Sequence, residues 1–201
     1  MRNNRQKVWK LIFFEDSTQF ISYMLFNCLL KALENKQNIK LVAVVDTATT
    51  EANSSIFKYI KYILKYFVIK IFNPKIKMPF IIEFNFLKIV KRKNLNVKIL
   101  IPDDRNINSK KFIEKIKELK PDIAFVAGCL QKFSHSLLTL FKYAVNYHNS
   151  LLPKYIGLYA TSFSILFNEK ETGFSFHFMN EKLDDGPIIV QDKNLSKRKL
   201  V

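Results

Sequence analysis

Glycine is scarce in this chain of 201 residues: there are four glycines, and none of them precedes Gly128. A Gly-rich phosphate loop needs glycine because its backbone adopts positive φ and approaches the phosphate closely. In P-loop proteins and dinucleotide-binding folds, such a loop follows the first strand. The sequence therefore excludes both kinds of nucleotide site from the part of the chain before Gly128.

Cysteine is also scarce, since Cys28 and Cys129 are the only two and form neither a CxxC nor a zinc-type spacing. This excludes a disulfide framework and gives no sign of a metal, so a reducing, cytoplasmic compartment is expected. Residues 1–14 have a basic head but only a short apolar run and no small-residue cleavage site. We interpret them as leading into a first strand and not as a signal peptide.

Acidic residues are outnumbered: 33 Lys and Arg against 17 Asp and Glu give a formal charge of +16. Residues 56–98 hold eleven of the basic residues and one acid, Glu83. Their lysines interrupt the apolar residues too often for a transmembrane segment. Two interpretations stay open: a crossover helix with a solvated lysine face, or a basic amphipathic helix that touches tRNA, a sugar nucleotide or a membrane.

Apolar runs alternate with amphipathic stretches along the chain, at 48% hydrophobic residues overall. Helical spacing of apolar residues predicts helices over 20–33 and 109–120, the second with Ser109 as N-cap and Pro121 as its stop. Short apolar runs predict strands over 8–14, 40–46, 96–101, 122–126 and 144–148. This alternation predicts one α/β domain with a three-layer, mostly parallel sheet and helices on both faces.

Polar residues gather at the end of the fifth predicted strand. Asn146, His148 and Ser150 are two apart, so they share one face if the strand continues. This is the carboxyl end of the strand, where open α/β sheets place ligands. Further on, residues 160–168 are expected to form a helix, 173–179 alternate as a strand, and a turn at 183–187 leads to a last strand over 188–191.

An amide, an imidazole and a carboxylate are the groups that acyl transfer to an amine requires. The amide of Asn146 can donate to an oxyanion. His148 titrates near neutrality and can move a proton or stabilise the oxyanion when charged. Asp184 can orient His148 or accept a proton through water. These residue types also occur together by chance, so chemistry alone leaves a structural role for each of them open.

The motifs here resemble those of the 10-formyltetrahydrofolate-dependent formyltransferases. NYHNSLLPKYIG is similar to the NxHxSLLPxxxG signature of that family, and KLDDGPIIVQ is similar to its LDxG segment at a comparable distance downstream. PDIAFVAGCLQKF resembles the strand and turn that precede the signature. The resemblance is specific over residues 121–191 and faint over 8–102. It implies a Rossmann-like formyltransferase fold, a folate co-substrate, an amine acceptor and no metal.

The resemblance also implies roles for single residues. Asn146, His148 and Asp184 correspond to the catalytic trio. The pterin slot is expected near a second set of residues: Ala127, Gly128, Cys129, Leu130, Gln131 and Asp185. Three more residues are candidates for substrate binding: Ser150, Lys154 and His177. Each has a plain alternative, because Ser150 can shape the turn, Lys154 can be solvated, and His177 can be an ordinary strand residue.

The acceptor is the least determined part of the prediction. The family's purine enzyme, phosphoribosylglycinamide formyltransferase, shares LPKYxGL but holds a phosphate with a Gly-rich turn after its first strand. Residues 15–19 read EDSTQ here, and their acids repel phosphate. A methionyl-tRNA-type acceptor or an amino-sugar nucleotide fits this turn and the basic charge better.

The C-terminal sequence, DKNLSKRKLV, is polar and basic where the family core continues with helix. We therefore expect residues 1–201 to be a single formyltransferase-like domain that is either truncated or divergent at its end. A degenerate domain that binds folate or nucleic acid without turnover stays open as an alternative.

Overall fold

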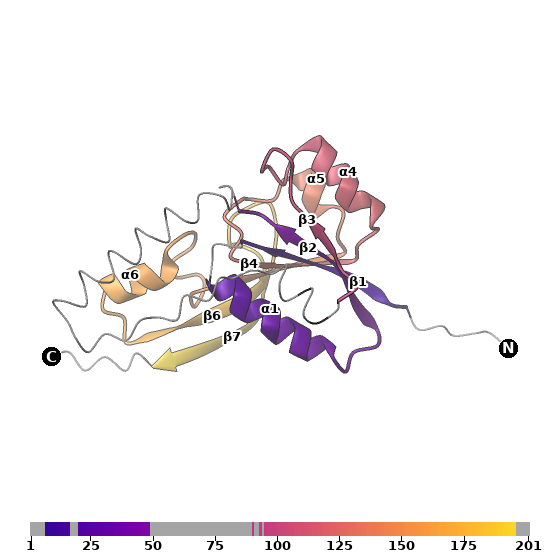
Figure 1. Cartoon of the computed structure of the whole chain (residues 1–201). Coiled ribbons are helices and arrows are strands. Elements are labelled where there is room, and N and C mark those ends of the chain that lie inside the picture. The colour runs from indigo at the N-terminus through magenta and orange to yellow at the C-terminus, as the bar shows by residue number, and fades with distance from the viewer. Residues whose placement is uncertain (1–6, 17–19, 49–89, 91–92, 94, 196–201) are drawn as a thin grey trace, which may run out of the picture.

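The computed structural model of the chain describes residues 7–16, 20–48, 90, 93 and 95–195. Most of the basic segment 56–98 lies outside these residues, so the two interpretations of it stay predictions. The described residues form a seven-stranded sheet with the strand order β3-β2-β1-β4-β5-β6-β7 (Figure 1). The first five strands of this order run parallel, and β6 and β7 are antiparallel. The predicted α/β class and mostly parallel sheet are confirmed.

The elements follow the predicted alternation closely. The strands are β1 (Trp9–Glu15), β2 (Ile39–Asp46), β3 (Lys98–Leu100), β4 (Ile123–Ala127), β5 (Tyr143–His148), β6 (Glu171–Phe178) and β7 (Ile188–Leu195). The helices are α1 (Phe20–Leu33), α4 (Lys110–Glu118), α5 (His135–Leu138) and α6 (Ala160–Leu166). No helix among the described residues is both long enough and apolar enough to cross a bilayer.

Period-two alternation in the central strands gives the sheet two apolar faces. In β1, Ile12 and Phe14 pack with α4 and α5, whereas Leu11 and Phe13 pack with α1. Phe14 meets Phe133 edge-on with ring centroids 4.8 Å apart. Helices therefore cover both faces, as Figure 1 shows with α4 and α5 on one side and α1 on the other. The central strands read as nearly continuous apolar runs because both of their faces are buried.

The amphipathic helix α4 buries the stripe that predicted it. Phe112 and Ile116 are the buried residues of α4. Ser109 is at the N-cap, as predicted, but its side chain makes no capping hydrogen bond. Its main-chain carbonyl accepts from Ile113 N at 2.9 Å instead.

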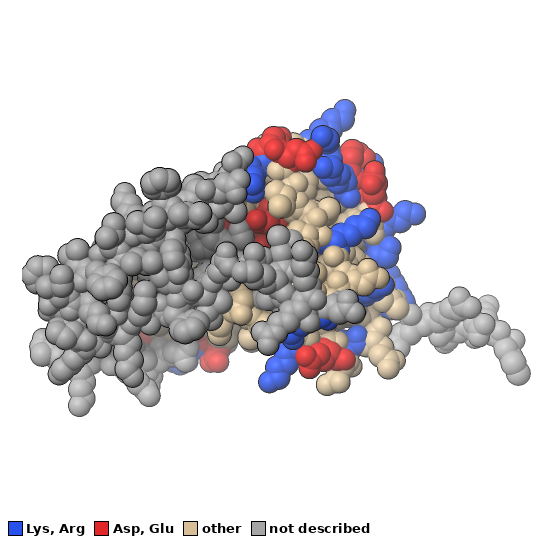
Figure 2. Space-filling view, in the orientation of Figure 1, with Lys and Arg blue, Asp and Glu red and all other residues tan. Residues whose placement is uncertain are grey.

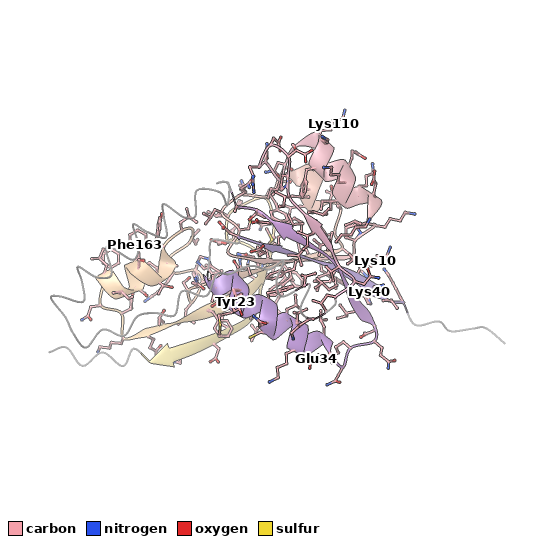
Figure 3. All side chains as sticks on the ribbon, viewed as in Figure 1. Lys10, Tyr23, Glu34, Lys40, Lys110 and Phe163 are labelled. Atoms are coloured by element: carbon pink, nitrogen blue, oxygen red, sulfur yellow. The ribbon has the colours of Figure 1, made fainter. Side chains whose placement is uncertain are left out.

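The sheet has a topological switch point between β1 and β4. The chain moves outward from β1 to β2 on one side and from β4 to β5 on the other, so neighbouring connections diverge there. Ligands of open α/β sheets bind outside the carboxyl ends of strands at such a point. Lys10 and Lys40 lie near the opposite, amino ends of β1 and β2, far from Phe163 of α6 (Figure 3). The sheet thus places the ends of β1, β4 and β5 around one crevice.

Candidate active site

Asn146 and His148 lie at the carboxyl end of β5, next to the crevice. Because β5 ends at His148, Ser150 lies beyond the strand and does not share its face as it would if the strand continued. The antiparallel register sets Asn146 opposite His177 of β6 and His148 opposite Ser175. Pairing with β6 therefore brings two histidines and one amide to the same end of the sheet.

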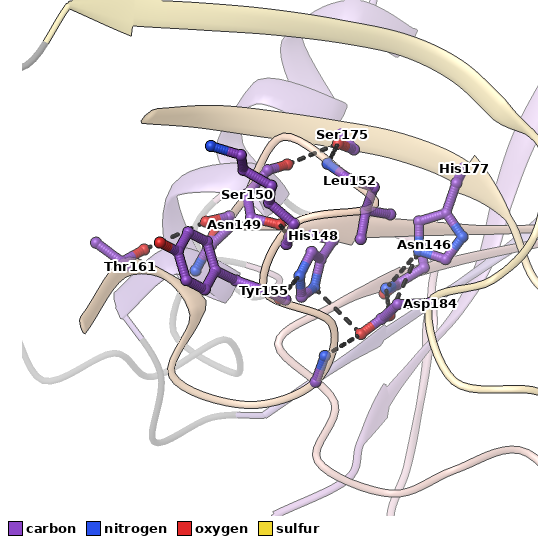
Figure 4. Close-up of polar contacts among 12 residues, drawn as sticks. Asn146, His148, Asn149, Ser150, Leu152, Tyr155, Thr161, Ser175, His177 and Asp184 are labelled. Atoms are coloured by element: carbon purple, nitrogen blue, oxygen red, sulfur yellow. Dashed lines mark hydrogen bonds and ion pairs between the residues drawn. The ribbon is translucent and has the colours of Figure 1, made fainter. Parts of the chain in front are cut away.

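Asp184 joins them from the turn between β6 and β7. Asn146 Nδ2 donates to Asp184 Oδ1 at 3.2 Å, and His148 Nδ1 lies 3.4 Å from Asp184 Oδ2 (Figure 4). The Asp184 side chain is 7% exposed. The three residues predicted to act together therefore do meet in one place, within direct contact of one another.

Two main-chain groups complete this cluster. Gly157 N donates to Asp184 Oδ2 at 2.9 Å, and the Tyr155 carbonyl lies 2.8 Å from His148 Nε2. Gly157 has a φ of +90°, a backbone conformation that is unfavourable for residues with a side chain. Nothing in the sequence indicates the Gly157 donor, because a main-chain N–H carries no residue-type signature.

The Asp184 carboxyl is held as an anion. Burial by itself raises its pKa, but the His177 hydrogen bond, the His148 ring and Gly157 N together bring the pKa below its ordinary value of 3.8. Hydrogen bonds and positive charge favour the charged form of a carboxyl, and here they outweigh desolvation. Asp184 is therefore a carboxylate near neutral pH.

The neighbours of each histidine fix where its protons lie. A carbonyl can only accept, so His148 Nε2 carries the hydrogen that points at Tyr155 O. In the same way, His177 Nδ1 donates to Phe178 O at 2.9 Å, and its Nε2 faces Asn146 Nδ2 at 3.1 Å. His177 Nε2 also lies 3.5 Å from Asp184 Oδ1, so it faces both the Asn146 amide and the Asp184 carboxylate.

A cleft of about 500 Å³ opens over this cluster. Residues from β4, β5 and the 183–184 turn line it together. The predicted site residues among its lining are Gly128, Cys129, Leu130, Gln131, Asn146, His148, His177 and Asp184. The volume is within the usual range for small-molecule sites.

The turn after β4 is rigidly built where it borders the cleft. Gly128 has a φ of +76°, which allows the chain to turn sharply there. Gln131 donates from Nε2 to Thr47 O and Arg105 O, both at 3.0 Å. Burial raises the pKa of the Cys129 thiol to about 11. Cys129 is therefore a protonated, unreactive thiol and lines the cleft as a nonpolar group.

The remaining predicted residues lie elsewhere. Ala127 is buried in the core, and Asp185 is half-exposed and pairs with Lys182 at 3.6 Å. Ser150 and Lys154 line a second cavity of about 680 Å³ on the other side of the 150–155 turn. Ser150 Oγ donates to Lys154 O at 2.6 Å, and Lys154 Nζ pairs with Glu169 at 3.2 Å. Among the described residues, no group of three or more His, Cys, Asp or Glu side chains is arranged so that it could hold a metal ion.

Side chains of β6 and β7 hydrogen-bond to the 150–155 turn and hold it against the sheet. Ser175 Oγ donates to Ser150 O at 2.6 Å and accepts from Leu152 N at 3.1 Å. Gln191 of β7 donates to Leu152 O at 2.9 Å. Alternation over 173–179 places Ser175 and His177 on one face, and the structure buries both of them. These bonds hold the chain that leaves His148.

The fold and the site define a class that known proteins share. Residues 81–195 match the model of the formyl transferase family, which is more than half of the chain. The chain belongs to this family. It is 36% identical over 119 residues to the bifunctional polymyxin resistance protein ArnA of Wigglesworthia glossinidia brevipalpis, covering 56% of this chain and 18% of that one.

Two further comparisons agree with this placement. A methionyl-tRNA formyltransferase of Methylacidiphilum infernorum is 38% identical over 107 residues, which are 53% of this chain and 33% of the relative. The matched chain thus spans a third or less of the length of these curated relatives. A phosphoribosylglycinamide formyltransferase from Bacillus halodurans has the same fold, with a TM-score of 0.66 at 19% identity over 94% of this chain and 81% of that chain.

Proposed function

We propose that this chain transfers a formyl group from 10-formyltetrahydrofolate to an amine. The observation that carries the proposal is the meeting of Asn146, His148 and Asp184 in one cleft that the 128–131 turn also lines. Family membership supports the same chemistry. A cytoplasmic location is part of the proposal, since Cys28 and Cys129 are both free thiols.

The lining of the cleft suits a folate. Its lining combines the apolar Val126, Leu130 and Leu183 with the main chain around Gly128. A flat heterocycle needs apolar walls and a few fixed polar groups, and exposed main chain at a glycine supplies the latter. We assign the residues 128–131 and Leu183 to holding the pterin in this proposal.

The residues act on the charge that transfer creates. The folate supplies a formyl carbon bound to N10. The amine forms a new C–N bond to this carbon, and the formyl oxygen becomes an oxyanion. Collapse then breaks the bond to N10, which leaves with the proton that the amine has lost. One N–H of the Asn146 amide turns away from His177 or Asp184 and donates to that oxyanion. A donor of this kind contributes roughly 3–4 kcal/mol. His148 adds positive charge beside the oxyanion, and Asp184 accepts the proton that the amine loses, directly or through water.

The acceptor that we propose is a methionyl-tRNA-type amine or an amino-sugar nucleotide. Two acids lie at the strand ends nearest the crevice: Asp16, directly after β1, and Asp46 of β2. An acidic edge disfavours a phosphate bound there. This counts against the purine acceptor, glycinamide ribonucleotide. We retain it as the second candidate because the chain shares its fold with a phosphoribosylglycinamide formyltransferase.

A parallel formyl-transfer assay tests the proposal. Purified chain receives 10-formyltetrahydrofolate with methionyl-tRNA, a 4-amino-sugar nucleotide or glycinamide ribonucleotide. Transfer to either of the first two supports the proposal, and transfer to glycinamide ribonucleotide alone selects the second candidate. Folate binding without transfer to any amine selects the degenerate, non-catalytic domain, and salt-dependent nucleic-acid binding without folate binding selects a basic binding protein.

A further inference from the structure

Tyr155 presents its main-chain carbonyl to the catalytic histidine in an unusual conformation. The carbonyl oxygen lies 2.8 Å from His148 Nε2, and Tyr155 itself has a φ of +56°. A residue with a side chain adopts this left-handed region at a cost, and it stays there only when its surroundings hold it. The contact with His148 therefore depends on what holds Tyr155.

The side chain of Tyr155 is held at both its hydroxyl and its ring. The hydroxyl donates to Glu169 Oε1 at 2.7 Å, and the ring stacks on Phe167 with centroids 6.2 Å apart and an interplanar angle of 9°. Glu169 and Phe167 directly follow α6, where Glu169 N donates to Ser164 O at 2.9 Å. Tyr155 is thus fastened to the end of α6.

The hydroxyl contact is charge-assisted. The Tyr155 hydrogen bond, followed by that of Lys154, lowers the pKa of Glu169, so this carboxyl is ionised at neutral pH. Glu169 in turn raises the pKa of Tyr155, which keeps the phenol a donor. Hydrogen bonds to an ionised acceptor are shorter and stronger than neutral ones. The pair therefore suits the task of holding a strained residue.

The contact with Tyr155 fixes which ring nitrogen of His148 faces which partner. With Nε2–H directed at Tyr155 O, the ring turns Nδ1 toward Asp184 Oδ2 at 3.4 Å. Both ring nitrogens then face oxygen atoms that can accept a hydrogen bond. The charged and titratable groups around this ring are Asp184 and, beyond it, His177.

We propose that Tyr155 and Glu169 form a positioning pair that sets the orientation and protonation of His148. Neither residue touches the reacting atoms. Both act through the Tyr155 carbonyl, which keeps the imidazole turned with Nδ1 at the carboxylate of Asp184. The kinetic part of this inference rests on the proposed formyl transfer, whereas the structural part does not.

The first test uses the unaltered chain. Nitrogen-15 NMR of labelled histidine reports which ring nitrogen of His148 carries a proton. We expect the Nε2 proton to be present and hydrogen-bonded across the neutral range. An Nε2 without a proton overturns the proposal, whatever the chain does with folate, so this result is independent of the proposed function.

The second test uses Tyr155→Phe, which removes the hydroxyl and keeps the ring that stacks on Phe167. Misplacement of a catalytic group by about an ångström costs on the order of 100-fold, so a partly released His148 should lower kcat by roughly 10- to 100-fold. KM for the folate should stay near the unaltered value, and the His148 nitrogen signals should shift. Unchanged kcat, or a lower kcat with unchanged His148 signals, overturns the proposal.

Two further variants complete the second test. Glu169→Ala should reproduce the effect of Tyr155→Phe, and the double variant should lose little more than either single one, since both remove the same contact. Additive losses would contradict a shared pathway. Tyr143→Phe is the matched control: it removes a hydroxyl at the other end of β5 and should leave kcat and the His148 signals unchanged.

Discussion

At the scale of single residues, Asp184 is the side chain on which the cluster depends. It contacts Asn146, His148, His177 and Gly157 N, and it does so from a left-handed conformation with a φ of +50°. Strained residues of this kind concentrate at functional sites.

Asp184 should link stability to acid pH. Because its folded pKa lies below the ordinary value, the stability that it contributes is present at neutral pH and is lost as the pH falls through the folded pKa. We expect Asp184→Asn to unfold more easily than the unaltered chain at neutral pH, with a difference that shrinks below about pH 4. Urea unfolding at several pH values measures this.

Asp185→Asn is the control for that experiment, because the neighbouring carboxylate is half-exposed. It should change the unfolding free energy little at any pH. A constant difference between Asp184→Asn and the unaltered chain from neutral pH down to acid would show that folding does not lower the pKa of Asp184.

Glu15 is the opposite case. It is 1% exposed, and its Oε2 has no hydrogen-bond partner among the residues that the structure describes. Burial, then the charges of Asp46 and Asp16, raise its pKa to about 10. The folded chain therefore keeps a proton that the unfolded chain has released. Stability falls as the pH rises from the ordinary pKa of 4.5 toward the folded pKa of about 10.

Glu15→Gln should remove this penalty, because the amide is uncharged throughout. We expect its unfolding free energy at about pH 8 to be higher than that of the unaltered chain by roughly 1–3 kcal/mol, with a flatter dependence between about pH 5 and 9. Denaturant unfolding measures both quantities. Glu34→Gln, on the exposed surface, should have no such effect, and an equal slope for Glu15→Gln and the unaltered chain would contradict the buried proton.

At the scale of elements, the turn between β6 and β7 depends on close approach of the backbone. A Cβ on Gly186 would lie 1.7 Å from the carbonyl oxygen of Phe178. Phe178 N also donates to Pro187 O, at the end of this turn, at 2.9 Å. The turn that carries Asp184 can therefore lie against β6 only because residue 186 has no side chain.

Gly186→Ala should displace the turn and Asp184 with it. We expect a loss of unfolding free energy of about 2–4 kcal/mol, typical of a substitution that forces the backbone apart. Thermal or urea unfolding measures it, and formyl transfer should fall as well. Glu181→Ala changes an exposed residue of the same turn and should be neutral; equal stability of Gly186→Ala would refute the close approach.

The elements that the sequence predicted best are those with an apolar pattern of their own. The stripe over 109–120 predicted α4 because Phe112 and Ile116 bury one side of it. β7 was predicted to end at Gln191, but it continues to Leu195. Asp192 and Lys193 are exposed there and pair with Phe174 and Gly173 of β6. That extension rests on long-range main-chain pairing, which exposed polar residues do not signal.

The candidate site likewise has a part that the sequence predicted and a part that it did not. Period two placed Asn146 and His148 on one face, and the family resemblance pointed to Asp184. The contacts of Tyr155 O and Gly157 N could not be predicted, because they depend on main-chain atoms in turns. The register that sets Asn146 against His177 is likewise a property of the paired strands and not of either segment alone.

At the scale of the whole molecule, the described surface does not carry a single sign of charge. Around α4, lysines alternate with acids, and Asp103 pairs with Lys111 at 2.6 Å and Lys115 at 3.2 Å (Figure 2). The formal charge of +16 still sets the long-range field of the chain. A net positive field attracts anionic acceptors and is screened by salt.

The proposed acceptors should therefore bind in a salt-dependent way. We expect KM for methionyl-tRNA to rise steeply between about 50 and 200 mM salt, as counterion release requires for a polyanion. The dissociation constant of the folate should change far less, because its site is a partly apolar cleft. Initial rates over a salt series measure the first, and a titration measures the second. A salt-independent KM for tRNA would exclude a polyanionic acceptor contact.

The most direct test of formyl transfer at this cleft is the rate of tetrahydrofolate release with a productive acceptor, measured for the unaltered chain and for His148→Ala. A general acid–base group contributes about 10²–10⁴-fold, so the variant should be slower by that factor while it still binds the folate. Equal rates for the two proteins would contradict the assignment of His148, and with it the proposed site.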